Sequence, residues 1–250
     1  PTMPTGIVYR LYSFIESANA SNMFVSNAWD YGRPNIVDDK VIRITRPSTI
    51  RYSEKLIPET FINGLSSCFD ENFESYDLTY GGIYKLYSED QSLRVFQELK
   101  IGSALIDQVT FNDFSGQDVV GASPDVLSTQ MIYYAGELGI GKHPESFSVY
   151  EKSKYGIDVK RGVVWRLSND GLTPISEYFQ HTFFTNLCKK ILKSTTKVNI
   201  YGVYDIRFGE YVISISSFTY GGIVEPAHTI AFNEKANMWS TYYSYSPDNM

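Results

Sequence analysis

The stretch Asp158–Leu167 has the sequence DVKRGVVWRL: an acidic residue, three further residues, a glycine, and then an apolar run that contains a tryptophan. An Asp side chain accepts a hydrogen bond from the backbone two residues on, and glycine readily adopts positive φ, so this pattern is typical of a tight turn. The Val-rich and Trp-containing run that follows favours a β-strand. The stretch therefore predicts a turn followed by the second strand of a hairpin.

The same pattern occurs three more times, as DLTYGGIYKL at 77–86, DIRFGEYVIS at 205–214 and NEKANMWSTY at 233–242. The predicted turn positions are Asp77 and Gly81, Asp158 and Gly162, Asp205 and Gly209, and Asn233 and Asn237. The aromatic residues expected to pack between the repeats are Tyr84, Trp165, Tyr211 and Trp239. Repeated hairpins of this kind are typical of the blades of a β-propeller, and the last copy resembles a kelch-type blade.

The composition also favours a mainly β fold. Aromatic residues make up 15% of the chain, and charged residues only 20%, which argues against disorder. We expect one β-rich, propeller-type unit over 1–250, with a possible division into a strand-and-loop region, 1–65, and a repeat-bearing region, 66–250. One amphipathic helix is predicted at about 176–193, with Ser176 as its cap and Phe179 on its apolar stripe.

Charge and hydropathy argue against two classes of partner. The net charge is −6 and no run of Lys and Arg exceeds two residues, so the chain lacks the pattern of a surface that grips nucleic acid. No apolar run approaches the roughly 18 residues that a membrane span needs. The two cysteines, Cys68 and Cys188, lack the spacing of a zinc site or a disulfide framework.

The one near match to a nucleotide-binding motif in the sequence fails at its last positions. Gly136–Lys142 has the glycine and lysine frame of a phosphate-binding loop, but His143 stands where Ser or Thr would bind magnesium, and Pro144 removes an N–H group. A glycine loop between hairpins is the preferred interpretation. We therefore expect no catalytic, cofactor-binding or metal-binding residue and predict that the chain is not an enzyme. A propeller glycosidase remains the least favoured alternative, because the 28 acidic residues leave a carboxylate pair open.

Several ordered segments resemble one known family. They are Ile83–Tyr87 with Leu93–Lys100, Gly139–Phe147, Tyr155–Ser168 and Asp170–Ser176. Together they resemble the stabilisation proteins of crAss-like, short-tailed bacteriophages, which are counterparts of podovirus tail hub or nozzle proteins. The resemblance extends over roughly Arg51–Met250.

This resemblance implies a virion structural protein of the phage tail, made in the host bacterial cytoplasm. It implies a homo-oligomeric ring, expected to be sixfold, below the portal and in contact with other tail proteins. Such a ring extends the ejection channel and helps retain the packaged DNA. Family members are larger than this chain, so we expect a segment of a larger chain. An acidic wall suits a channel that DNA passes through without specific binding.

The alternative from another class is a carbohydrate-binding or receptor-binding propeller that presents aromatic platforms.

The sequence also predicts the cost of two substitutions. Trp165→Ala is expected to lower the free energy of unfolding by about 3–5 kcal/mol if the ring is buried between blades. Asp158→Ala is expected to lower it by only about 1 kcal/mol, as the loss of one turn hydrogen bond.

Overall fold

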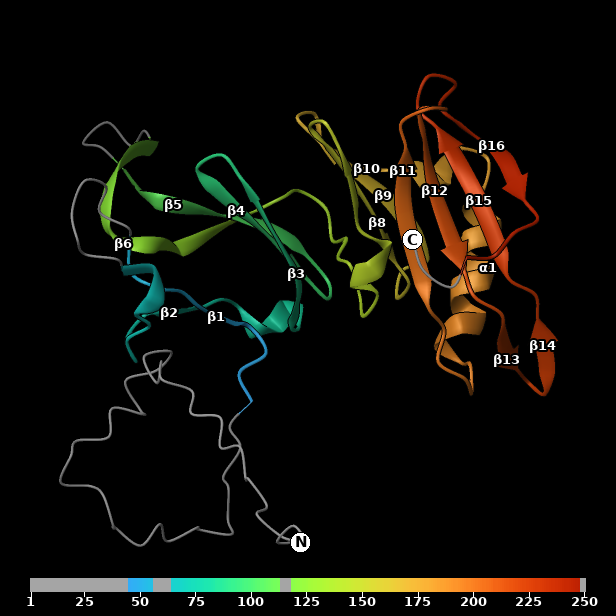
Figure 1. The fold of residues 1–250 in the computed structure, drawn as a ribbon, viewed down its shortest axis with the longest axis horizontal. Helices are drawn as coiled ribbons and strands as arrows, with labels where there is room; N and C mark the ends of the chain where they lie inside the picture. The colour runs from blue at the N-terminus through green and yellow to red at the C-terminus, as the bar shows by residue number, and fades with distance from the viewer. Residues whose placement is uncertain (1–44, 56–63, 113–117, 248–250) are drawn as a thin grey trace, which may run out of the picture. The chain divides into compact units, whose positions relative to one another are not determined.

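The computed structural model describes residues 45–55, 64–112 and 118–247 of the chain (Figure 1). The expected mainly β fold is confirmed: these residues form several antiparallel sheets and one α-helix. Most of the predicted strand-and-loop region, 1–65, lies outside the described residues.

The chain divides into two compact units. The smaller comprises Pro1–Ile44 and Arg51–Phe73, and the larger comprises Thr45–Ile50 and Glu74–Met250. The boundary passes through two short strands, β1 (Thr49–Arg51) and β2 (Phe73–Ser75). The described part of the smaller unit contains the 3₁₀ helix η4 (Gly64–Ser66). The elements described below belong to the larger unit.

The larger unit contains three four-stranded antiparallel sheets, and in each the strand order follows the order of the chain. The first sheet consists of β3 (Ile83–Glu89), β4 (Ser92–Gln97), β5 (Ile101–Asn112) and β6 (Asp118–Tyr133). The second consists of β7 (Ser148–Tyr150), β8 (Ser153–Asp158), β9 (Val163–Ser168) and β10 (Gly171–Pro174). The third consists of β11 (Ile200–Asp205), β12 (Glu210–Ile215), β15 (His228–Asn233) and β16 (Met238–Tyr243).

A separate two-stranded hairpin of β13 (Phe218–Tyr220) and β14 (Ile223–Glu225) interrupts the third sheet in sequence. Three 3₁₀ helices lie between strands: η5 (Leu78–Tyr80), η6 (Pro144–Ser146) and η7 (Ile175–Glu177). In the described part of the chain the three sheets stay separate, and they close into neither a barrel nor a propeller.

Three copies of the repeated turn lie where the sequence predicts hairpins. They join β8 to β9, β11 to β12, and β15 to β16, and each pair of strands is antiparallel. The copy at 77–81 is different, and its prediction as a hairpin is wrong. Asp77 there caps η5, and the strand that follows, β3, pairs with β4 rather than with β2. The turn chemistry is the same, but a second glycine, Gly82, follows the turn, and the preceding strand β2 pairs with β1.

The helix begins later than the sequence predicts. Residues 175–177 form η7, and the helix α1 covers His181–Leu192 with Gln180 as its N-cap. Ser176 is buried within η7 rather than capping the helix. Phe179 has positive φ, at 66°, and 86% of it is exposed. This kink before the helix removes Phe179 from the apolar stripe, which instead consists of Phe184, Leu187, Cys188 and Ile191.

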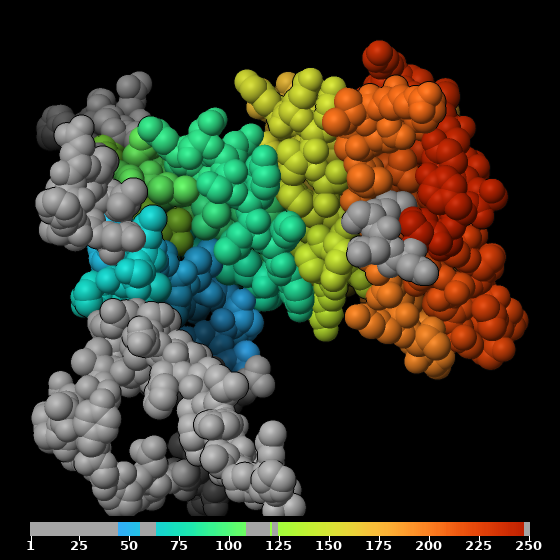
Figure 2. Space-filling view, viewed as in Figure 1, coloured from blue at the N-terminus to red at the C-terminus, as the bar shows by residue number. Residues whose placement is uncertain are grey.

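Two clusters of buried side chains hold the sheets together. The larger lies between the second and third sheets and includes the apolar face of α1, which Figure 1 shows behind β12 and β15. The smaller lies between the first and second sheets and consists of Phe96, Ile101, Ile140, Trp165 and Leu167. Figure 2 shows the surfaces of these two sheets, green and yellow, directly against each other. Burial of large apolar side chains at both seams is the main stabilising contribution to this unit.

Four tyrosine rings form a stacked column between the second and third sheets. Tyr150 stacks on Tyr204 with ring centroids 4.0 Å apart, and Tyr155 stacks on Tyr211 at 4.8 Å. Tyr155 also stacks on Tyr204 at 5.5 Å, so the rings alternate between the two sheets along the column. Stacked aromatic pairs add roughly 0.5–1.5 kcal/mol each beyond the area they bury. The column therefore ties the second sheet to the third.

Candidate functional site

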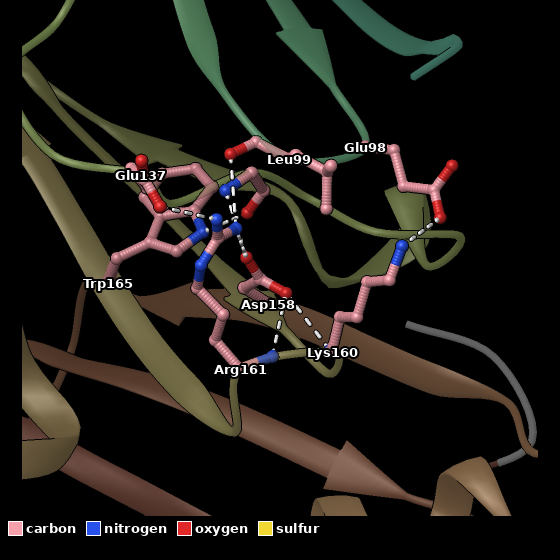
Figure 3. A network of polar contacts seen from close by, with 8 residues as sticks. Glu98, Leu99, Glu137, Asp158, Lys160, Arg161 and Trp165 are labelled. Carbon is pink, nitrogen blue, oxygen red and sulfur yellow. Dashed lines mark hydrogen bonds and ion pairs between the residues drawn. The ribbon is translucent and has the colours of Figure 1, made fainter. Parts of the chain in front are cut away.

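The turn that precedes Trp165 is the centre of the network of polar contacts that Figure 3 shows. Its backbone follows the predicted pattern: Gly162 N donates to the carbonyl of Asp158 at 2.8 Å, and Gly162 has φ of 72°. One carboxylate oxygen of Asp158 accepts from the backbone N of Lys160 at 3.0 Å and of Arg161 at 3.2 Å. This oxygen therefore holds the turn itself.

The second carboxylate oxygen of Asp158 connects the turn to another part of the chain. It accepts from Gly139 N at 3.1 Å and from the Arg161 guanidinium at 3.3 Å. Asp158 is fully buried, at 0% exposure, so these donors replace the water that an exposed carboxylate would have. The carboxylate thus closes its own turn and also anchors the glycine-rich segment.

Gly139 bonds to the second sheet, whereas the residues that follow it bond to the end of β4 in the first sheet. Its carbonyl accepts from the indole nitrogen of Trp165 at 2.7 Å. The next two residues, Ile140 and Gly141, donate their backbone N–H groups to the carbonyls of Gln97 and Glu98. A side chain at position 139 would place its Cβ 2.3 Å from the carbonyl oxygen of Glu98, so only glycine permits this approach.

Two cations of the same turn reach the first sheet and its following loop. Arg161 donates to the carbonyl of Leu99 at 3.2 Å and pairs with Glu137 at 3.1 Å, as Figure 3 shows. Lys160 pairs with Glu98 at 3.3 Å. We call the set Glu98, Leu99, Glu137, Gly139, Asp158, Lys160, Arg161 and Trp165 the Asp158 junction.

Trp165 provides the apolar half of the Asp158 junction. Its ring is fully buried and stacks on Phe96 of the first sheet with an interplanar angle of 11° and centroids 5.7 Å apart. Across the β8–β9 pair it faces Gly156, where a Cβ would lie 2.5 Å from the ring. The missing side chain at Gly156 therefore makes the space that the indole occupies.

The other predicted turn residues form separate turns, and the turn at 77–81 lies against Glu98 and Leu99 of the junction. Asp205 and Gly209 hold the β11–β12 turn, and Asn233 and Asn237 hold the β15–β16 turn. Asp77 bonds Thr79 N at 2.8 Å, and Gly81 ends η5 with φ of 81°. Of the predicted turn residues, Asp158 is a member of the Asp158 junction, and Gly162 closes the same turn.

The other predicted packing aromatics have different surroundings. Tyr211 is fully buried, belongs to the tyrosine column and donates to the carbonyl of Ser146 at 2.7 Å. Trp239 packs on Phe184 of α1 and donates to the carbonyl of Ile175 at 3.0 Å, so it seals the helix rather than a neighbouring sheet.

The prediction that Tyr84 packs between repeats is wrong, since 37% of this residue is exposed. It lies at a β-bulge of the edge strand β3, between the paired residues Ile83 and Lys85, and has no opposite residue on β4. The bulge leaves the ring at the surface.

The glycine loop is the part of the junction whose role the sequence interpretation missed. The three glycines between 136 and 141 serve two purposes: Gly139 permits close backbone approach, whereas Gly136 and Gly141 adopt positive φ. The charged partners Glu98 and Arg161 carry no local signal, because their contacts form between distant parts of the chain.

The Asp158 junction pairs each of its charged side chains with an opposite charge. Such an arrangement binds one sheet to another. Among the described residues, no group of three His, Cys, Asp or Glu is placed to hold a metal ion. No helix in the described ranges is both long and apolar enough to cross a membrane. Comparison with protein-family models gives no match to this chain, and comparison with curated proteins gives none either.

Proposed function

We propose that this chain is a structural component of a bacteriophage tail nozzle or hub, in which it forms part of a ring around the channel for DNA. The single observation that carries the proposal is the series of three consecutive four-stranded meanders. A blade of a β-propeller is a four-stranded antiparallel sheet of this kind, and blades follow one another along the chain. In this proposal the three sheets are successive blades.

The two seams between the sheets support this interpretation. Trp165 of the second sheet stacks on Phe96 of the first, and the tyrosine column joins the second sheet to the third. In a propeller, each blade buries its apolar face against the next in the same way. The resemblance of the segments between Ile83 and Ser176 to phage stabilisation proteins points to the same architecture.

The polar chemistry of the chain is compatible with a mechanical role. The side chains of the Asp158 junction bond to backbone groups of other segments, which serves to hold sheets in place. The net charge of −6 disfavours binding to DNA phosphates, which suits a channel wall past which DNA slides. We propose that other tail proteins and the portal are the neighbours of the ring.

Light scattering and negative-stain imaging of the same purified sample test the proposal. We expect a homo-oligomer with a central hole and sixfold symmetry, with large interfaces typical of obligate assemblies. A single monomeric species at high protein concentration would contradict the ring. A gel-shift assay with duplex DNA at physiological salt should show no retention, and tight binding would contradict a non-gripping channel wall.

The alternative of a carbohydrate-binding module receives less support from the site. Trp165 and Trp239 are buried, and the nitrogen of each indole is bonded to a backbone carbonyl, so neither ring is available as a sugar platform. If the protein binds a glycan array and still binds it after both residues are substituted, this alternative is supported.

A further inference from the structure

A second polar site lies near the opposite end of β8 from Asp158. There a half-open hollow of about 270 Å³ separates the first sheet from the second. The side chains that matter for its chemistry are those of Glu89, Arg94, Tyr134, Lys154, Ser168 and Asn169. Glu89 and Arg94 come from the β3–β4 hairpin, whereas Lys154 and Ser168 come from β8 and β9. The hollow therefore draws charged groups from both sheets.

The lining carries an excess of positive charge. One carboxylate, that of Glu89, faces two cations: it accepts from Arg94 Nε at 3.0 Å through one oxygen and from Lys154 Nζ through the other. Lys154 has a side-chain exposure of only 4%, so its ammonium is largely withdrawn from water. A cation with little water needs anionic partners, and here one carboxylate serves two cations.

Ionisation of Glu89 is favoured by the same contacts. Burial alone would raise the pKa of Glu89, but the hydrogen bonds and charges of Lys154 and Arg94 outweigh burial and lower this pKa. Glu89 is therefore a fixed negative charge at neutral pH, and the hollow retains one uncompensated cation.

Donors remain available in the hollow. Arg94 uses Nε for Glu89 and one terminal nitrogen for the Tyr134 hydroxyl, and its other terminal nitrogen has no protein partner within the described residues. The Ser168 hydroxyl oxygen is buried and likewise has no hydrogen-bond partner in the described part of the chain. A buried hydroxyl without a partner costs about 1–3 kcal/mol, so a ligand that accepts its hydrogen bond is favoured.

We propose that this hollow binds a small oxyanion, which carries a carboxylate or a phosphate group. The free terminal nitrogen of Arg94 donates to such a group from a charged guanidinium, Lys154 adds a point charge, and Ser168 adds a neutral donor. Asn169 lies at the exposed rim of the hollow. This site is independent of the proposed tail role, and its failure leaves the ring proposal untouched.

A neighbouring hollow offers space for the rest of a ligand whose charged group lies in the first hollow. It has a volume of about 290 Å³, shares Arg94 and Tyr134 with the first, and is lined also by Leu105 and Ile132. An organic acid with an apolar part could place that part against these side chains, whereas inorganic phosphate would occupy only the charged hollow. Comparison of the two ligands therefore distinguishes the two sources of the oxyanion.

Calorimetric titration with sodium phosphate and with sodium benzoate tests the proposal, with sodium chloride keeping the ionic strength constant. We expect saturable binding of one equivalent of at least one of the two ligands. Benzoate binding alone would identify an organic acid, and phosphate binding alone would identify a phosphate group.

Two variants locate the binding without breaking the ion pairs of Glu89. Ser168→Ala should weaken binding about tenfold, which corresponds to one hydrogen bond to a charged group. Asn169→Asp should abolish binding, because it places a carboxylate at the rim. Ser88→Ala is the matched control: Ser88 is exposed, immediately precedes Glu89 on β3, and points to the opposite face of the sheet.

The proposal is overturned if neither ligand gives saturable heat, since the hollow would then hold water alone. It is also overturned if the Ser168→Ala and Asn169→Asp variants bind as the unchanged protein does. Near-ultraviolet circular dichroism of each variant establishes that its fold is intact before the titration.

Discussion

The same turn residue has different energetic weight at different copies of the repeat. Asp205 is partly exposed, and within the described residues its carboxylate bonds only N–H groups of its own turn. Asp158 is fully buried and also accepts from Gly139 and from the Arg161 side chain. Environment rather than sequence pattern therefore decides how much each Asp contributes to stability.

Substitution of Asp158 should consequently cost more than the sequence alone predicts. Asp158→Ala leaves the buried N–H group of Gly139 without its acceptor, and we expect the free energy of unfolding to fall by about 2–4 kcal/mol. Arg161 moderates the loss, since its side chain is 30% exposed and can return to water. Denaturant midpoints followed by tryptophan fluorescence measure the change.

Asp205→Ala provides the matched control for this measurement. It removes the same turn carboxylate at a partly exposed site, and the expected loss is about 1 kcal/mol. Equal losses for the two variants would mean that the bond between Asp158 and Gly139 does not stabilise the fold.

Two histidines should make stability depend on pH. Burial lowers the pKa of His143 and of His228 from the ordinary value of 6.5, more strongly than the neighbouring Glu145 and Glu225 raise it. The unfolded chain therefore takes up protons at higher pH than the folded chain does, and stability should fall as the pH drops below about 6.5.

Thermal midpoints between pH 7.5 and about pH 5 test this dependence, in a window above the ordinary pKa of the carboxylates. The double variant with His143→Gln and His228→Gln should show a clearly smaller decrease in midpoint over this range. If its decrease matches that of the unchanged protein, the two histidines are not the cause.

At the scale of elements, the position of α1 relative to its preceding turn has a measurable consequence. Phe184 is fully buried on the helix, whereas Phe179 precedes it and is 86% exposed. Phe184→Ala should lower the free energy of unfolding by about 3–5 kcal/mol, and Phe179→Ala should change it by less than about 0.5 kcal/mol. Chemical denaturation of both variants provides the comparison, and similar losses would support a helix that begins at Ser176.

The glycine-rich segment gives a second prediction at this scale. Gly139→Ala would bring a methyl group against the backbone of Glu98, which cannot rotate away, and we expect a loss of about 3 kcal/mol. Gly221→Ala is the control, because position 221 has open space around it and only the strain of its φ of 58°. That strain costs about 1–2 kcal/mol. A smaller loss at Gly139 than at Gly221 would contradict the close contact.

Local sequence signals predict some of these elements and not others. The hairpin turns at Asp158, Asp205 and Asn233 follow from side-chain and glycine chemistry within five residues, so the sequence locates them well. The start of α1 does not follow from its apolar period, because η7 and the positive φ of Phe179 interrupt the helical backbone before His181. The bond between Asp158 and Gly139 joins separate segments, and no local sequence pattern predicts which residue Asp158 bonds.

At the scale of the whole molecule, the alkylation rates of the two cysteines report whether the folded protein opens. Cys68 is exposed, whereas Cys188 is buried on α1, and burial raises the pKa of its thiol to about 12. Because the thiolate is the reactive form, Cys188 should resist alkylation in the folded protein. Mass spectrometry after brief maleimide treatment should find Cys68 modified and Cys188 modified only in denaturant. Rapid native labelling of Cys188 would mean that α1 opens readily from the sheets.

The tyrosine column gives the second and third sheets a shared optical signature. Its four rings alternate between the sheets, and neighbouring rings are 4.0–5.5 Å apart with small interplanar angles. Their electronic transitions therefore couple, and the resulting near-ultraviolet dichroism depends on the distance between the two sheets. Separation of the sheets would remove this signal while the far-ultraviolet signal of the strands remains. The contact between these two sheets can thus be followed in solution without any label.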